Sequence, residues 1–118
     1  MTESKLTSKS MDFAVKIVNL NKELQKTKEY SISNQIICSG TSIGANIREA
    51  RFAQSDLDFI HKMSIALKEA NETLYWIELL KRTDYISDPT YKTLHRDCDE
   101  LVRMLHSTVL TCKKKLDK

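Results

Sequence analysis

Hydrophobic positions recur every three or four residues along most of the chain, which is the repeat of an amphipathic α-helix. The first run predicts a helix over residues 8–26, with Ser8 or Ser10 as its N-cap, that fades in the polar segment 25–29. A second helix is predicted over residues 31–52, beginning near Ser31 or Ser33. The inward positions of these two helices are Leu6, Ser10, Phe13, Ile17, Leu20 and Leu24, then Ile32, Ile36, Ile43, Ile47 and Ala50.

Two longer helices follow. One is predicted over residues 55–83, with Ser55 as N-cap and Asp58 three residues later in the spacing of a capping box. It carries two apolar stripes, so we expect it to touch several helices or a second subunit. The other is predicted over residues 88–116, since Pro89 marks its first turn and its apolar residues follow heptad steps. Four helices with short connections predict an all-α, antiparallel up-down-up-down four-helix bundle in a single domain, residues 1–118.

A patch of small residues interrupts the apolar stripe of the second helix. It consists of Ser39, Gly40, Thr41 and Ser42, and Gly44 follows closely. Each glycine lowers helix stability by about 1 kcal/mol relative to alanine. The patch therefore predicts either a tight contact with a neighbouring helix or a local kink.

Composition excludes several classes of protein. With 118 residues, two glycines and one proline, the chain is too short for two ordinary domains and too poor in turn residues for an all-β fold. A glycine-rich nucleotide loop is excluded for the same reason. The beginning of the sequence has no apolar segment typical of a secretory signal, so we expect a cytoplasmic protein without a membrane partner. Cys38, Cys98 and Cys112 lie far apart, and we expect them to be reduced and buried.

The charge is mildly basic, with 19 Lys and Arg against 16 Asp and Glu. A run of lysines ends the last helix, where cations suit the helix dipole, and on charge alone a solvated helix end is favoured over a phosphate-binding patch. Arginine, in contrast, is suited to bidentate phosphate contacts. The candidate nucleic-acid-binding residues are Arg48, Arg51, Arg96, Arg103, Lys113, Lys114 and Lys115.

Candidate catalytic and metal-binding chemistry is sparse. Asp58 and His61 have the spacing of half a di-iron motif, but no matching set follows on the other helices. No spacing sets a base beside a serine or cysteine nucleophile. We therefore predict a non-enzymatic protein with no cofactor, no metal and no catalytic residue.

Polar residues beside the apolar stripes of the second and third helices have two interpretations. They form either a hydrogen-bond network that fixes the register of the two helices or a binding site, and the register role is favoured. The residues concerned are Ser39, Ser42, Asn46 and Glu49, then Glu69, Asn71 and Glu72.

The segment SGTSIGANIREA, residues 39–50, resembles the S-x-x-S-[IV]-x-A-N-I-x-E signature of the bacterial four helix bundle family, also called the 23S ribosomal RNA intervening sequence protein family. Residues 58–80 resemble that family's third helix, including Ala66 and the glutamate six residues later. One departure is Glu49-Ala50, where many members have Glu-Gly. The resemblance implies a structural role for the signature residues Ser42, Asn46, Glu49 and Glu72.

The resemblance also implies a homopentamer around a central channel. A related protein, the accessory variability determinant of diversity-generating retroelements, is a basic pentamer that binds nucleic acid and a reverse transcriptase. Five copies at +3 would give a ring of about +15, which would attract RNA or DNA. We therefore expect a homo-oligomeric nucleic-acid-binding protein. The alternative is a scaffold for another protein, such as a polymerase, without nucleic-acid contact.

Overall fold

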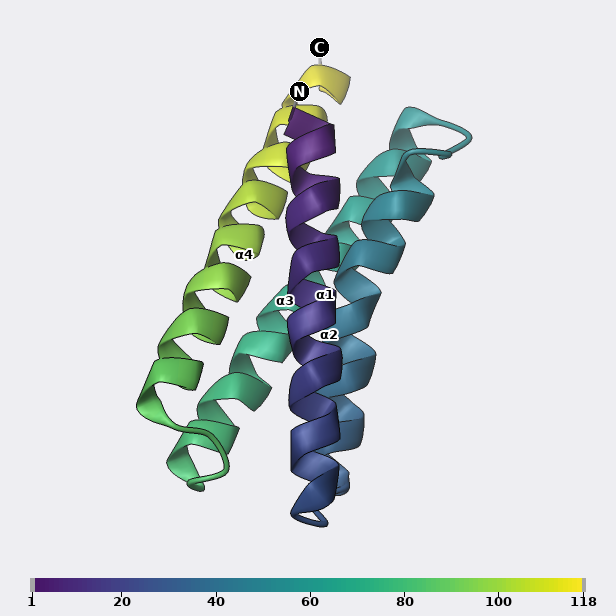
Figure 1. Ribbon diagram of the computed structural model, residues 1–118. Coiled ribbons are helices and arrows are strands. Elements are labelled where there is room, and N and C mark those ends of the chain that lie inside the picture. Colours follow the sequence, from purple (N-terminus) through teal and green to yellow (C-terminus); the bar gives the residue numbers. More distant parts are fainter. Residues whose placement is uncertain (1, 118) are drawn as a thin grey trace.

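The computed structural model describes residues 2–117, which form four α-helices (Figure 1). They are α1 (Thr2–Lys26), α2 (Ser31–Ala50), α3 (Asp56–Arg82) and α4 (Asp88–Leu116). Successive helices run in opposite directions, and each packs against its neighbours in the order α1, α2, α3, α4 and back to α1. The bundle measures 51 × 22 × 22 Å. The predicted antiparallel up-down-up-down bundle is confirmed.

The helix ends follow local capping chemistry, with three differences from the prediction. Ser55 and Ser87 are the N-caps of α3 and α4, and each hydroxyl accepts a hydrogen bond from the backbone amide three residues later. However, α1 begins at Thr2 rather than near residue 8, and Ser10 is buried inside it. The carboxylate of Glu29, not a serine, accepts hydrogen bonds from the first amides of α2. Finally, α2 ends at Ala50 instead of residue 52, because the next amides bond three residues back in tight turns.

Apolar side chains from all four helices meet along the bundle axis. Burying one Leu, Ile or Phe side chain stabilises a fold by about 1.5–3 kcal/mol. Both neighbours of α3 use its wide apolar face, since α3 packs on α2 and on α4. The largest fully buried side chains are those of Leu6, Phe13, Ile17, Leu24, Ile36, Ile43, Met63, Thr73, Ile77, Leu80, Leu101 and Leu105.

The small residues of α2 make a tight contact with α1. A Cβ atom added to Gly40 would lie 2.9 Å from both Cγ atoms of Ile17, closer than real Cβ contacts come. At Gly44 the nearest atom, the Ser10 hydroxyl oxygen, would lie 3.3 Å away. Since α2 runs without interruption from residue 31 to residue 50, the patch serves close packing rather than a kink.

We expect Gly40→Ala to destabilise the bundle. The β-branched side chain of Ile17 is stiff and fully buried, so it cannot rotate away from the added methyl group. Overpacking costs about 1–3 kcal/mol, which outweighs the gain of about 1 kcal/mol in helix propensity. Urea unfolding followed by circular dichroism measures the change. Gly44→Ala is the matched control and should be neutral or stabilising; a Gly40→Ala variant as stable as the parent would contradict the contact.

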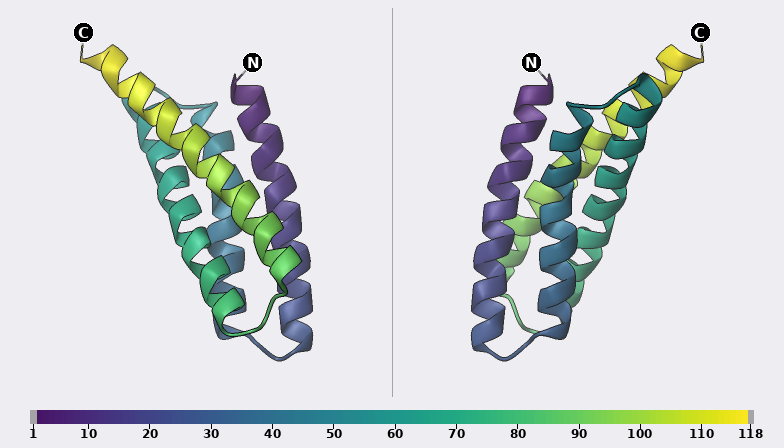
Figure 2. Two further views of the ribbon diagram at one scale, coloured as in Figure 1. Left: turned by 90° about the vertical axis from the view of Figure 1, so that its left-hand side faces the viewer. Right: turned by 90° about the vertical axis from the view of Figure 1, so that its right-hand side faces the viewer.

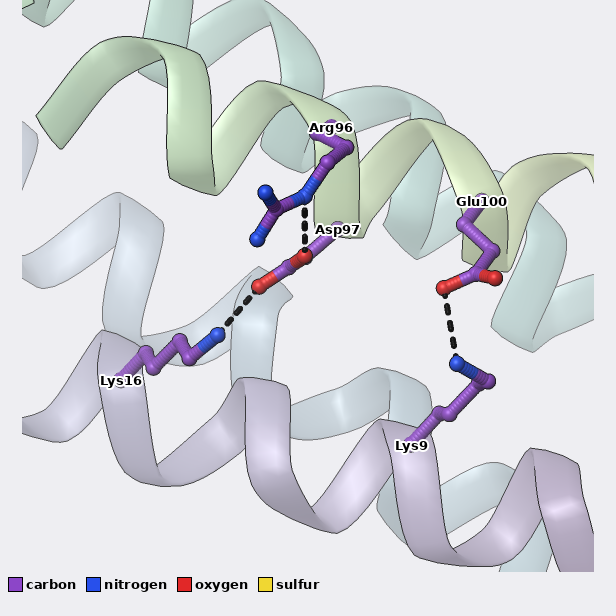
Figure 3. Close-up of polar contacts among 5 residues, drawn as sticks. All are labelled: Lys9, Lys16, Arg96, Asp97 and Glu100. Atoms are coloured by element: carbon purple, nitrogen blue, oxygen red, sulfur yellow. Dashed lines mark hydrogen bonds and ion pairs between the residues drawn. The ribbon is translucent and has the colours of Figure 1, made fainter. Parts of the chain in front are cut away.

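The interface between α1 and α4 is the smallest of the four. The C-terminal half of α4 diverges from the N-terminal half of α1 (Figure 2). Two ion pairs bridge this seam (Figure 3): Lys9 to Glu100 at 3.1 Å, and Lys16 to Asp97, which also accepts a hydrogen bond from Arg96. Charged contacts therefore supplement the apolar packing where that packing is thinnest.

Asp97 makes the stability of this seam depend on pH. Burial raises the pKa of its carboxyl and is the largest single effect, but the hydrogen bonds and charges of Lys16 and Arg96 together hold the pKa below its usual value. A carboxyl with a lowered pKa in the folded state stabilises the fold above its unfolded pKa, near 3.8. That contribution is lost as the pH falls through the lowered value.

We expect Asp97→Asn to lower the free energy of unfolding at pH 7 by about 0.5 kcal/mol, as partly exposed ion pairs do. The difference from the parent should shrink as the pH falls below 3.8, because the parent carboxyl is protonated as the pH passes through its lowered pKa. Urea unfolding at pH 7, pH 4 and pH 2.5 tests this. Glu78→Gln removes a carboxylate that pairs within α3, with Arg82, and serves as the control. A difference for Asp97→Asn that is equal at pH 7 and pH 2.5 would rule out the carboxylate's role.

Candidate nucleic-acid interface

Three parts of the chain lie at the same end of the bundle, although α4 diverges there from α1 (Figure 2). The N-terminus of α1, the connection between α2 and α3 (residues 51–55) and the C-terminus of α4 all lie there (Figures 1 and 2). We call it the basic end. It carries five of the predicted nucleic-acid-binding residues, all exposed to solvent: Arg48, Arg51, Lys113, Lys114 and Lys115.

The arginines differ in whether a carboxylate neutralises them. Arg82, Arg96 and Arg103 each pair with a carboxylate of their own helix, at 3.1, 3.1 and 2.7 Å. Arg48 and Arg51 have no ion-pair partner between residues 5 and 117, where the side chains are described. The two arginines at the basic end thus keep their donors for a ligand.

The other two predicted arginines lie apart from this group. Arg96 and Arg103 are on the shaft of α4, about 25 and 15 Å along the helix before Lys113. Arg96 takes part in the seam with α1, and Arg103 pairs with Asp99. The structure therefore does not bring them together with Arg48 and Arg51.

Two hydrogen bonds with Asp58 shape the connection between α2 and α3, in an arrangement close to a capping box. The Ser55 hydroxyl accepts a hydrogen bond from the Asp58 amide at 3.1 Å, and the Asp58 carboxylate accepts one from the Gln54 amide at 3.1 Å. Phe52 projects from this connection with 79% of its surface exposed. Beside it lies an open pocket of about 640 Å³, lined by Arg48, Glu49, Phe52, Gln54, Asp58 and Lys62.

Among the described side chains, Arg48 is the charged residue of this pocket that lacks a partner. Glu49 pairs with Lys62 at 3.3 Å, and Asp58 is occupied by the Gln54 amide. Sequence reasoning did not single out Phe52. A signal was present, because the inward stripe of α2 runs through Ile47 and Ala50, and Phe52 lies off it.

Most signature polar residues bond within their own helix. The Ser42 hydroxyl donates to the Cys38 carbonyl, and the Asn46 amide donates to the Ser42 carbonyl at 2.8 Å. Glu72 accepts from the Trp76 indole at 3.1 Å. Glu49, through Lys62, is the signature residue whose ion pair joins α2 to α3.

The model of the 23S rRNA-intervening sequence protein family matches residues 2–107. This chain belongs to that family. It is also 54% identical to a solved protein of unknown function from the S23 ribosomal protein family of Bacteroides thetaiotaomicron. The two superpose with a TM-score of 0.90 over 92% of this chain and 98% of that chain. A comparison with curated proteins finds no match. The resemblance seen in residues 39–50 is thus confirmed at the level of the family.

In this family member, buried hydroxyls and an amide link the helices. The hydroxyls of Ser39 on α2 and Thr73 on α3 lie 2.8 Å apart, and both residues are buried. Asn21 on α1 donates to the Ser33 carbonyl on α2 at 3.0 Å. Sequence reasoning missed Thr73, although it stands at an inward position of the stripe between Ala70 and Ile77.

The flank of α3 has the opposite electrostatic character to the basic end. Burial raises the pKa of the Glu69 carboxyl, the nearby Glu72 raises it further, and Lys68 partly opposes both. Neither glutamate pairs with a cation among residues 5–117.

The three cysteines are free thiols in different surroundings. Cys98 is buried as expected, and burial, followed by the charges of Asp99 and Asp97, raises its pKa to about 12, so the thiol stays protonated. Cys38 is exposed and Cys112 half-buried, contrary to the expectation that all three are buried. Cys38 points outward because Ile36, Ser39 and Gly40 occupy the inward positions of α2.

Residues 5–117 contain no cluster of three or more His, Cys, Asp or Glu side chains arranged to hold a metal ion. Within residues 2–117, no helix combines the length and the apolar character needed to span a membrane.

We expect Thr73→Val to destabilise the bundle by about 1–2 kcal/mol, because it leaves the buried Ser39 hydroxyl with only a long bond of 3.5 Å to the Ile36 carbonyl. The double variant Ser39→Ala/Thr73→Val should lose less than the sum of the two single variants, since no hydroxyl is then stranded. Urea unfolding of the parent, Ser39→Ala, Thr73→Val and the double variant gives the coupling energy between the two hydroxyls. Strictly additive losses would show that the pair makes no interhelical contribution.

Proposed function

We propose that this chain is a non-enzymatic, homo-oligomeric protein that binds RNA or DNA through its basic end. The proposal rests on the difference between the arginines that pair with a carboxylate and the arginines that do not. Three of the arginines are neutralised on the flanks of the bundle, whereas Arg48 and Arg51, at the end that also carries Lys113–Lys115, have no ion-pair partner among the described side chains. Unpaired guanidinium groups can each form two hydrogen bonds with a phosphate.

Oligomerisation would multiply this surface. We propose the homopentameric ring that the family resemblance implies, and cyclic symmetry would repeat each basic end once per subunit. The outward face of α1 supports a contact with a second copy. Met11 and Val15 are about half exposed there, at 48% and 52%. Next to Met11, a pocket of about 420 Å³ between α1 and α2 is lined mainly by small side chains such as Ala14, Gly44 and Ala45.

Salt titration of binding tests the nucleic-acid contact. The logarithm of the affinity for duplex DNA should fall linearly with the logarithm of salt concentration, by about 0.9 per neutralised phosphate. We expect Arg48→Gln/Arg51→Gln to weaken binding and to lower this slope by about 1.8, because two phosphate contacts are lost. Fluorescence anisotropy with labelled duplex DNA and labelled structured RNA provides both quantities.

The matched control is Arg82→Gln/Arg103→Gln, which removes the same charge from paired positions and should leave the slope nearly unchanged. Light scattering on the same samples gives the assembled mass, and a monomer at micromolar concentration would contradict the ring. Absence of binding by the parent protein at low salt would refute the nucleic-acid role. The search would then turn to co-purifying proteins, as expected for a scaffold.

A further inference from the structure

Phe52 stands out among the large hydrophobic side chains of the described residues. It is 79% exposed, more than any other of them. The chain's other phenylalanines are used for packing, since Phe13 is 1% exposed and Phe59 packs against the core. Leaving one such side chain in water forgoes the stabilisation that burial would provide. The bundle does not use Phe52 for its own packing.

We propose that Phe52 is a stacking platform for an unpaired base, so that the basic end binds single-stranded nucleic acid in preference to a duplex. This inference rests on the proposed function and names the form of its ligand. Single-strand-binding proteins combine a basic surface that follows the backbone with aromatic side chains on which bases stack. Both elements are present in one short segment of this chain, residues 48–52.

The backbone holds Phe52 in place. Its amide donates to the Glu49 carbonyl at 3.0 Å, and the next amide, of Ala53, donates to the Ala50 carbonyl at 3.1 Å. The Ser55 cap of α3 begins only three residues later. Because both sides of the segment are anchored, little conformational entropy is lost when a base stacks on the ring.

The groups around the ring suit a nucleotide. Arg48 lies one helical turn before Phe52, and both line the pocket of about 640 Å³. A base stacked on the ring would thus have a free guanidinium beside it for its phosphate. The amide side chain of Gln54, in the same pocket, offers both a donor and an acceptor for the edge of a base.

A duplex cannot use this site in the same way, because its base faces are already covered by neighbouring base pairs. Only an unpaired base presents a free face to a side chain. Arg48 and Arg51 contact phosphate in either form, whereas Phe52 contributes only with a single strand. The arginines therefore provide affinity for either form of nucleic acid, and Phe52 provides the preference for a single strand.

The test compares two probes on the full chain: a fluorescein-labelled oligo-uridine and a labelled DNA duplex of equal length. We expect Phe52→Ala to weaken oligo-uridine binding by about 5- to 150-fold, the range found for loss of one stacked base, and duplex binding by less than about twofold. Phe52→Trp should retain the parent affinity because it keeps an aromatic face. An oligonucleotide with a single 2-aminopurine should lose fluorescence on binding the parent and less on binding Phe52→Ala.

Tyr75→Ala is the matched control. Tyr75 is 62% exposed and packs edge-to-face on Trp76 in the second half of α3, away from the basic end. Tyr75→Ala should change neither the affinity for oligo-uridine nor the affinity for the duplex.

The possible results separate the two proposals. If Phe52→Ala weakens both probes equally or neither, while Arg48→Gln/Arg51→Gln weakens both, the stacking role is wrong and the nucleic-acid role stands. If the parent binds neither probe, both proposals are wrong. If Phe52→Ala changes the assembled mass in light scattering, Phe52 is a contact between copies of the chain, and the stacking role is overturned.

Discussion

The close approach of α2 to α1 is tightest at the contact of Gly40 with Ile17. The Ile17 side chain lies where a Cβ atom of residue 40 would stand, so the two helices approach more closely than side chains normally permit. Ser10 opposite Gly44 continues this approach one turn later. The next turns of α2 carry Arg48 and lead directly to Arg51 and Phe52. The packing that makes α2 a rigid part of the bundle therefore also fixes the place of the candidate binding groups.

Charges are distributed in two ways in this bundle. On the flanks, cations lie beside carboxylates: Lys9 and Lys16 bridge α1 to α4, and the flank arginines pair within their helices. At the basic end, the arginines have no such partner among the described side chains. Net charge alone does not show this difference, since +3 is modest for a nucleic-acid-binding protein. What matters to a phosphate is which cations are unpaired and whether they lie together.

Local features were predictable from the sequence, and features set by helix packing were not. The Ser55 cap and the break at Pro89 depend on neighbouring residues and were predicted correctly. Ser10 was a plausible cap by residue type, but it is buried where α1 meets α2 and only a small side chain fits. The pairing of Arg103 with Asp99 is visible as a four-residue spacing. The spacing places Phe52 off the inward stripe of α2 and Thr73 on the inward stripe of α3. The Ser39–Thr73 bond also required the relative placement of the two helices, which no local pattern specifies.

Salt weakens both the ion pairs on the flanks of the bundle and the binding of phosphate at the basic end. The two effects differ greatly in size. Screening weakens the ion pairs of the seam, yet partly exposed pairs contribute only about 0.2–1 kcal/mol each. A domain of this kind is stabilised by about 5–15 kcal/mol, mostly through its apolar core. Moderate salt therefore leaves the bundle folded. Release of counterions from a bound nucleic acid instead changes affinity by about 0.9 logarithmic units per contact for each tenfold change in salt. A steep dependence of binding on salt at constant helicity must therefore arise at the contact with phosphate and not from opening of the α1–α4 seam.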